Sequence, residues 1–242
     1  MGLSSRQMLS ALAGGETDAA AMAQLAHGRL RDKLSELERA LAGRVGPHQR
    51  FLLARQLAHI DFLDASIAEV SAEIAARLRP CDAELERLAT IPGIGRRTAE
   101  LLVAEIGTDM SRFPTPAHLA SWAGMCPGND ESAGKRRSGK TRKGSPWLRS
   151  TLIEAARAAG RSKGTYLAAQ YHRLAARRGT KRAAVAVGHT ILVIAHRLLS
   201  EGDVYRDLGD RYFDERNRHA VERRLVTRLE GLGYTVSLEA AA

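Results

Sequence analysis

Apolar residues recur at helical spacing over residues 30–78, and this periodicity constrains the fold more than any other feature of the sequence. A first run occupies Leu30, Leu34, Leu37 and Leu41. After a breaker rich in Gly and Pro, a second run occupies Leu53, Leu57, Ile60, Leu63, Ile67, Val70, Ile74 and Leu78. Steps of three and four residues place such side chains on one face of a helix. The sequence therefore predicts two helices that fold back as a hairpin, either a coiled coil or one edge of a globular bundle.

The rest of the chain also favours helices over a large sheet. Only 5% of the residues are aromatic and β-branched runs are scarce, while 44% hydrophobic residues suffice for a buried core. We expect a mainly α fold with a helical entry over residues 1–28, a coiled-coil helical hairpin over 29–80 and a larger helical domain over 81–242. Asp18 is placed to cap a short helix of the entry.

Cysteine usage and hydropathy set aside secreted and membrane-spanning classes. Cys81 and Cys126 are too few for a disulfide framework or a closed zinc site. No stretch approaches the roughly 20 uninterrupted apolar residues that span a bilayer, and the N-terminus lacks the apolar core of a signal peptide. The eight histidines show no spacing that indicates shared metal ligation. We expect a cytoplasmic protein with no membrane partner and no metal site of its own.

Positive charge is concentrated between Lys135 and Arg182. That stretch holds fifteen Lys or Arg residues and one acid, Glu154, so it carries +14. Because the whole chain carries a formal +10, the remaining residues sum to −4. Such a density of like charge indicates a polyanionic partner, and duplex nucleic acid supplies one charge per about 1.7 Å.

The alternatives to a nucleic-acid partner are a solvated charged face and a lipid-surface patch. A lipid-binding helix shows Trp, Phe and Leu opposite its basic residues. The densest basic part here, residues 135–144, contains Gly and Ser and is expected to form a loop. The basic footprint therefore favours a nucleic-acid partner.

A compact pattern over residues 85–107 predicts two helices flanking the turn Pro92-Gly93-Ile94-Gly95. Glycines permit a tight turn whose N–H groups face a phosphate, and the following helix begins there with its positive dipole end. Arg96 and Arg97 add positive charge. The pattern resembles a helix-hairpin-helix DNA-binding element, and the alternative is a plain tight turn between two helices.

Residues 126–149 predict a Gly-flanked serine loop that runs into the basic stretch. Ser132 lies in this loop, and Pro146 opens a helix that continues through Ala159. A serine thus lies beside a surface suited to phosphate binding. By the residues alone, Ser132 is more typical of a turn or cap than of a nucleophile.

Several motifs in order resemble the C-terminal transposase domain of the insertion-sequence one-ten family. They are Ile91-Pro92-Gly93-Ile94-Gly95, Phe113-Pro114, Leu119-Ala120-Ser121-Trp122-Ala123-Gly124, Cys126-Pro127-Gly128, Glu131-Ser132-Ala133-Gly134-Lys135, Lys140-Thr141-Arg142-Lys143-Gly144 and Trp147-Leu148-Arg149. In that family a RuvC-like domain with four acids precedes the coiled coil and binds magnesium. Some members are guided by a structured RNA, and membership implies a homo-oligomer with the coiled coil as the contact.

The resemblance implies that Ser132 is the nucleophile, with Ser138 as a competitor. Predicted DNA-binding residues are Gly93, Gly95, Arg96, Arg97, Lys135, Arg136, Arg137, Lys140, Arg142, Lys143 and Arg149. Nothing before Leu30 shows the alternating strands of an acid-bearing domain, so we expect a truncated serine transposase, inactive alone, whose magnesium would belong to the missing domain. The alternative is a non-catalytic DNA- or RNA-binding module, or a remnant, that associates with intact transposase.

Overall fold

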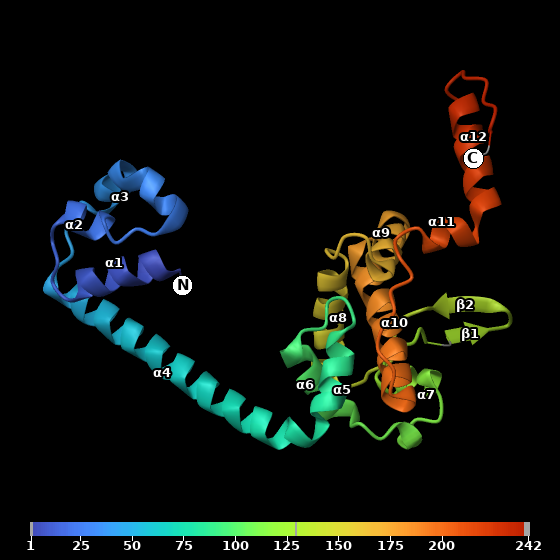
Figure 1. Ribbon diagram of the computed structural model, residues 1–242, viewed down its shortest axis with the longest axis horizontal. Coiled ribbons are helices and arrows are strands. Elements are labelled where there is room, and N and C mark those ends of the chain that lie inside the picture. The colour runs from blue at the N-terminus through green and yellow to red at the C-terminus, as the bar shows by residue number, and fades with distance from the viewer. Residues whose placement is uncertain (1, 129, 240–242) are drawn as a thin grey trace. The chain divides into compact units, whose positions relative to one another are not determined.

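The computed structural model describes residues 2–128 and 130–239, and it confirms a mainly helical chain (Figure 1). The contacts divide the chain into two compact units, Met1–Arg77 and Leu78–Ala242. The division falls at the C-terminal end of the long helix α4 (Pro47–Leu78).

The N-terminal unit begins with a cluster of short helices. They are α1 (Leu3–Ala13), α2 (Ala19–Ala23), the 3-10 helix η1 (Gly28–Lys33) and α3 (Leu34–Leu41). Asp18 caps α2 as the sequence predicts, because its carboxylate accepts hydrogen bonds from the backbone N–H groups of Ala20 and Ala21. Met8 and Met22 are buried, so they form part of the small apolar core of this unit.

The structure corrects the expected hairpin of α3 and α4. Helix α3 packs against α2 instead of folding back along α4. The physical reason is length: α3 has 8 residues and α4 has 32, so α3 reaches only a small part of α4 and its apolar side chains meet α2 first. Leu57 is the one residue of α4 that is buried, and apolar side chains along this helix stay exposed, including Phe62, Ile67 and Val70.

The C-terminal unit is a helical domain with an irregular connection in its middle. Its helices are η2 (Arg79–Cys81), α5 (Asp82–Ala89), α6 (Arg96–Ile106), η3 (Met110–Arg112), α7 (Pro116–Trp122), α8 (Pro146–Ala159), α9 (Tyr166–Arg178), α10 (Thr180–Glu201), α11 (Tyr212–Arg216) and α12 (Arg218–Glu230). Helix α10 is central, since it packs against α5, α7, α8 and α9. Gly188 allows α8 to approach closely, because a Cβ there would lie 3.1 Å from the carbonyl oxygen of Leu152.

Helix α10 has the length and composition of a membrane span, with a mean hydropathy of 1.5 over its apolar window, and half of that window is buried inside the unit. Val187, Ile191 and Leu192 are fully buried in the core. No other helix of the described residues passes the same test. The apolar length of α10 therefore follows from its place at the centre of a helical core.

The segment between α7 and α8 contains the two strands that the structure describes. They are β1 (Asp130–Ser132) and β2 (Lys135–Ser138), which pair antiparallel. Outside them, an isolated bridge joins Pro127 to Thr141. The sequence predicts a loop here, and the structure shows that its two arms are paired with each other.

Candidate nucleic-acid interface

The predicted serine loop is a β-hairpin, called here the serine hairpin (residues 130–138). Ser132 lies opposite Lys135, and Ala133 and Gly134 form the connecting turn. Both turn residues have positive φ values, 50° and 72° respectively, as a two-residue type I′ turn requires. The turn therefore holds Ser132 next to the first basic residue of the charged segment.

The hydroxyl groups of Ser132 and Ser138 differ in their contacts. Ser132 is exposed, and none of the described groups makes a hydrogen bond to its side chain. The Ser138 hydroxyl accepts a 3.1 Å hydrogen bond from the backbone N–H of Lys140. Ser138 thus stabilises the turn after β2, whereas the Ser132 hydroxyl is open to an incoming group. An unassisted serine hydroxyl is a weak nucleophile, and the described side chains place no general base within hydrogen-bond reach of Ser132.

Unpaired positive charge follows the hairpin along residues 139–145, called here the basic strap. The exposed basic side chains of the hairpin and the strap are Lys135, Lys140, Arg142 and Lys143. In the part of the chain that the structure describes, no carboxylate forms an ion pair with any of them. Arg136 and Arg137 contribute backbone to β2, and their side chains lie outside the described residues. Among the described side chains of the hairpin and the strap, these four cations are therefore exposed to solvent without a carboxylate partner.

Close backbone contacts hold the basic strap against the end of α7. A Cβ at Gly144 would lie 2.3 Å from the carbonyl oxygen of Ala123, so only glycine fits there. Arg149 Nη1 donates hydrogen bonds to the carbonyl oxygen of Gly124 at 3.0 Å and to Oγ1 of Thr141 at 2.8 Å. Arg149 therefore has a structural contact that the sequence does not predict, and its contact with DNA stays a prediction.

Helix α8 begins directly after the strap, at the predicted Pro146. The Ser145 hydroxyl accepts a 3.2 Å hydrogen bond from the backbone N–H of Leu148 and so caps the helix. Trp147 is 71% exposed beside this cap. Sequence reasoning uses Trp147 only as a family motif and misses it as an exposed aromatic side chain next to the basic strap. The sequence signal for such a side chain is a Trp in the first turn of a helix that directly follows a basic run.

The predicted helix-hairpin-helix region consists of α5, a turn and α6, but its first glycine serves packing. Gly93 has a φ of +88°, and a Cβ there would lie 2.3 Å from the carbonyl oxygen of Ala155 and 2.6 Å from the backbone nitrogen of Ala159. The turn is therefore pressed against α8. Gly95 differs because it is exposed at the start of α6, and a Cβ there would meet nothing within 4 Å. DNA binding by this element stays a prediction.

The two arginines at the start of α6 lie in ion pairs. Arg96 Nη2 lies 2.6 Å from Asp82 Oδ1, and Arg96 Nε lies 3.2 Å from Glu100 Oε1. The hydrogen bonds that Arg96 donates to Asp82 and to Glu100, in that order of effect, raise the pKa of its guanidinium. Arg97 Nη1 lies 3.2 Å from Oε2 of the same Glu100, which is buried. The charges that the sequence assigns to phosphate binding are thus partly neutralised within the element.

One acid of the C-terminal tail pairs with the basic segment. Arg173 Nη1 lies 2.8 Å from Asp214 Oδ1, and the Arg173 guanidinium lies over the ring of Phe213 at 5.3 Å. The ring of Tyr166 stacks on that of Phe213 at 5.0 Å and meets the ring of Tyr212 edge-on at 5.2 Å. The tail is therefore attached to α9, which removes one of the fifteen cations from those available to a partner.

Histidines and acids do not assemble into a metal site among the described residues. No group of three or more His, Cys, Asp or Glu side chains there could hold a metal ion. His196 is a buried core residue whose Nε2 donates a 2.7 Å hydrogen bond to the carbonyl oxygen of Phe113. Burial lowers the pKa of His189 on the same helix. These residues do not fit the magnesium that the resemblance implies, so no step is derived through a metal in this chain.

Comparisons with known proteins find transposases and a gene-inverting protein. The model of the "Transposase IS116/IS110/IS902 family" matches residues 85–172. The chain is 32% identical to a putative transposase y4pF/y4sB of Sinorhizobium fredii over 55% of this chain and 38% of the relative. It is 32% identical to the transposase for insertion sequence element IS1328 of Yersinia enterocolitica over 46% of this chain and 33% of the relative. A pilin gene-inverting protein of Moraxella bovis is 51% identical over 19% of this chain and 14% of the relative.

The matched parts thus span less than two fifths of the length of these relatives. The family match begins within α5 and ends within α9, so it contains the α5–α6 turn, the serine hairpin and the basic strap. Both the order of the motifs and the match over these elements point to the insertion-sequence one-ten family. Residues 85–172 therefore match the IS116/IS110/IS902 family of transposases.

Proposed function

We propose that this chain binds DNA in the transposition of an insertion sequence, through the serine hairpin and the basic strap. The observation that carries the proposal is the set of exposed cations without carboxylate partners in the described part of the chain: Lys135, Lys140, Arg142 and Lys143. Phosphate contacts of this kind supply affinity and position, and they carry no sequence information directly. The rigid attachment of the strap through Gly144 and Arg149 supports a fixed surface over a flexible tail.

The test is the affinity of the whole chain for duplex DNA. A triple variant, Lys135→Gln, Lys140→Gln and Arg142→Gln, removes three unpaired charges from the proposed surface. A matched control, Arg31→Gln, Arg39→Gln and Arg44→Gln, removes three exposed charges from the N-terminal unit. The first variant binds more weakly and the second binds nearly as the parent does. Equal losses of affinity in both variants would contradict the proposal, because DNA binding would then depend on net charge and not on this surface.

In the proposed chemistry the Ser132 hydroxyl attacks a DNA phosphodiester. A bond forms between Ser132 Oγ and phosphorus, a phosphorus–oxygen bond to the leaving nucleotide breaks, and the proton of Ser132 passes by way of a base to the leaving oxygen. The phosphoserine link conserves the energy of the broken bond for rejoining. Lys135 and the strap cations would offset the charge on the transferring phosphoryl group. The base belongs to another domain or chain in this proposal, as does the magnesium of the acidic domain.

Covalent capture tests this chemistry. The chain is incubated with cognate element ends, magnesium and the acidic N-terminal domain of an intact relative, and protein–DNA adducts are separated under denaturing conditions. An adduct that disappears in Ser132→Ala and persists in Ser138→Ala supports the assignment. Absence of any adduct that depends on Ser132, together with intact DNA binding, leaves the second candidate, a non-catalytic binding module. The open but unassisted hydroxyl of Ser132 is the observation that favours that candidate.

We also propose that the chain self-associates through α4. Phe62, Ile67 and Val70 are 65%, 60% and 59% exposed on this helix, and α3 does not cover it. Burying such side chains against a second copy stabilises a dimer, by about 25 cal/mol per Å² of apolar surface. Sedimentation of Ile67→Ser and Val70→Ser against the parent chain tests this contact, because a dimer that persists unchanged in both variants contradicts it.

Two further expectations accompany this proposal, a cytoplasmic location and a structured guide RNA. Competition of duplex DNA by structured RNA for the parent chain tests the second. Displacement of DNA by that RNA, and not by an unstructured RNA of equal length, supports a guide. Equal displacement by both would contradict it.

A further inference from the structure

Helix α12 stands apart from the core of the C-terminal unit. None of its residues is buried, and the short helix α11 is the element that it contacts most. It lies outside residues 85–172, which the family model matches. Its 13 residues give a rod about 20 Å long with a diameter of about 10–12 Å. An exposed helix of these dimensions is available to a partner over most of its circumference.

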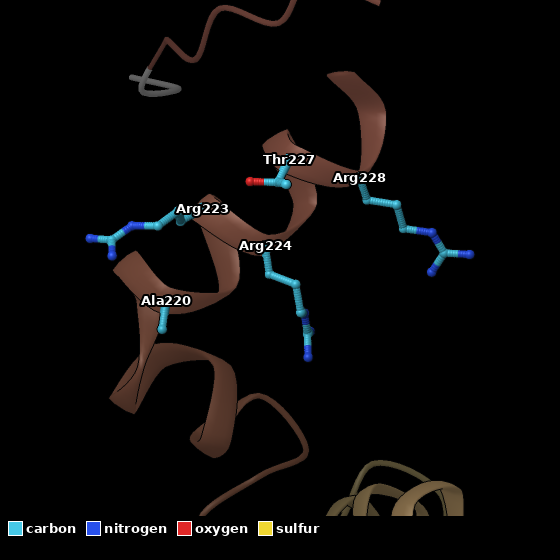
Figure 2. Close-up of a pocket in the computed structure, with 5 residues that line it drawn as sticks. All are labelled: Ala220, Arg223, Arg224, Thr227 and Arg228. Atoms are coloured by element: carbon cyan, nitrogen blue, oxygen red, sulfur yellow. The ribbon is translucent and has the colours of Figure 1, made fainter. Parts of the chain in front are cut away.

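One face of α12 is formed by arginines. A shallow surface hollow is lined by Ala220, Arg223, Arg224, Thr227 and Arg228. These positions follow the i, i+3, i+4, i+7, i+8 pattern of a single helix face. Figure 2 shows Arg224 and Arg228, one turn apart, extending from the helix into open space, with Arg223 and Thr227 directed to another side. All three arginines are exposed to solvent.

The arginines of this face have no internal counter-charge in the described part of the chain. Glu222 contacts two residues in the first turn of α12. Its Oε1 lies 2.8 Å from Arg218 Nε, and its Oε2 lies 3.5 Å from His219 Nδ1. No carboxylate there forms an ion pair with Arg223, Arg224 or Arg228. The helix thus separates its paired charges from these three arginines.

We propose that the arginine face of α12 is a second DNA-binding surface, at which the helix lies in the major groove and the arginines contact the phosphates. The major groove of B-DNA is about 12 Å wide, which accommodates a helix. Guanidinium groups bind phosphate oxygens in a two-pronged geometry. The small residues Ala220 and Gly231 flank the arginines on this face, so no bulky side chain separates the helix from the DNA.

Two other partners fit less well. The major groove of A-form RNA is too narrow and deep for side chains to read. A membrane surface would use the apolar stripe of α12, on which Leu225 and Leu229 are 51% and 42% exposed. Helices of that class carry Trp and Phe beside Leu, and α12 contains no Trp, Phe or Tyr. Duplex DNA is therefore the partner that the observations favour.

The test measures binding of the whole chain to a DNA duplex of unrelated sequence over a range of salt concentrations. The variant Arg223→Gln, Arg224→Gln, Arg228→Gln removes the charges of the face. A second variant with Lys at the same three positions keeps them, and a third, Leu225→Gln and Leu229→Gln, alters only the apolar stripe. Circular dichroism checks that each variant keeps the helix content of the parent.

We expect the slope of log affinity against log salt to fall in magnitude by about 0.9 for each phosphate that an arginine no longer neutralises, about 2.7 for the Gln variant. The Lys and Leu variants keep the parent slope. An unchanged slope in the Gln variant overturns the proposal. A weakening confined to double-stranded RNA also overturns it, as does binding to phosphatidylserine vesicles that disappears in both the Gln and the Leu variants while DNA binding stays unchanged.

The proposal for the α12 surface can be tested independently of the proposal for the basic strap. The Gln variant of α12 is therefore also made in a chain that carries the strap substitutions Lys135→Gln, Lys140→Gln and Arg142→Gln. An additional fall in slope in that background supports α12 even where the strap substitutions alone have no effect. If the α12 substitutions cause no additional fall in slope, while the strap substitutions alone do lower it, the α12 proposal is overturned and the strap proposal stands.

Discussion

The α5–α6 turn and the basic strap are both Gly- and Arg-containing segments, and they differ in where their charges go. Arg96 is paired with Asp82 and Glu100, whereas Arg142 and Lys143 are exposed with no carboxylate partner among the described residues. Acids occur throughout the helices that flank the turn and are absent from residues 135–149. Positive charge is available to DNA only where the fold does not already neutralise it.

The glycines of the two segments share a structural purpose. Gly93 lets the α5–α6 turn press against α8, and Gly144 lets the strap press against the end of α7. Close backbone packing accounts for glycine at both positions, so neither needs a bound phosphate to explain it. The difference between the two segments therefore rests on their side chains.

The largest change in stability is expected at Gly93, the glycine that packs against α8. Gly93→Ala places a Cβ 2.3 Å from the carbonyl oxygen of Ala155 at a φ of +88°, so it lowers the free energy of unfolding by about 2–4 kcal/mol. Urea unfolding measures it. Gly95→Ala is the matched control, because its Cβ would meet nothing within 4 Å, and it changes the free energy of unfolding by less than about 1 kcal/mol. Equal effects at both positions would show that the turn is not packed as described.

The next effect is expected at the anchor of the strap. Arg149→Met keeps much of the side-chain length and removes the hydrogen bonds to Gly124 and Thr141. The free energy of unfolding falls by about 1–3 kcal/mol, since the acceptors on the buried Gly124 and the half-buried Thr141 are left without their donor. Affinity for duplex DNA falls as well. Thr141→Val removes only one of the two hydrogen bonds, so its smaller effect is the control, and unchanged stability in Arg149→Met would contradict the anchor.

A smaller effect is expected at the cap that joins the strap to α8. Ser145→Ala removes the acceptor for the backbone N–H of Leu148 and lowers the free energy of unfolding by about 1 kcal/mol. Ser145→Asp keeps an acceptor and keeps the stability. Thermal unfolding of the two variants separates them, and identical midpoints would mean that the cap contributes nothing.

The helices were predictable because periodicity and end signals are local. Pro146 starts α8 and Asp18 caps α2 as expected, since both act through the nearest backbone groups. Non-local partners were not predictable. The pairing of α3 with α2 depends on which apolar surface meets it first, and the serine hairpin has no apolar alternation to indicate strands.

The site was predictable by residue type and not by role. The sequence places Ser132 and the basic residues in one segment, and the structure keeps them there. The sequence does not reveal that Arg149 holds backbone, that Gly93 faces α8, or that Arg96 lies between two acids. These roles depend on neighbours that are distant along the chain, which spacing alone does not report.

The salt dependence of DNA binding in two double variants separates the contribution of unpaired charge from that of paired charge. Arg142→Gln with Lys143→Gln removes unpaired charge from the strap, and Arg96→Gln with Arg97→Gln removes paired charge from α6. The account predicts that the slope of log affinity against log salt falls in magnitude by about 1.8 in the strap variant and stays near the parent value in the α6 variant. The opposite ranking, with the larger fall in the α6 variant, would contradict it.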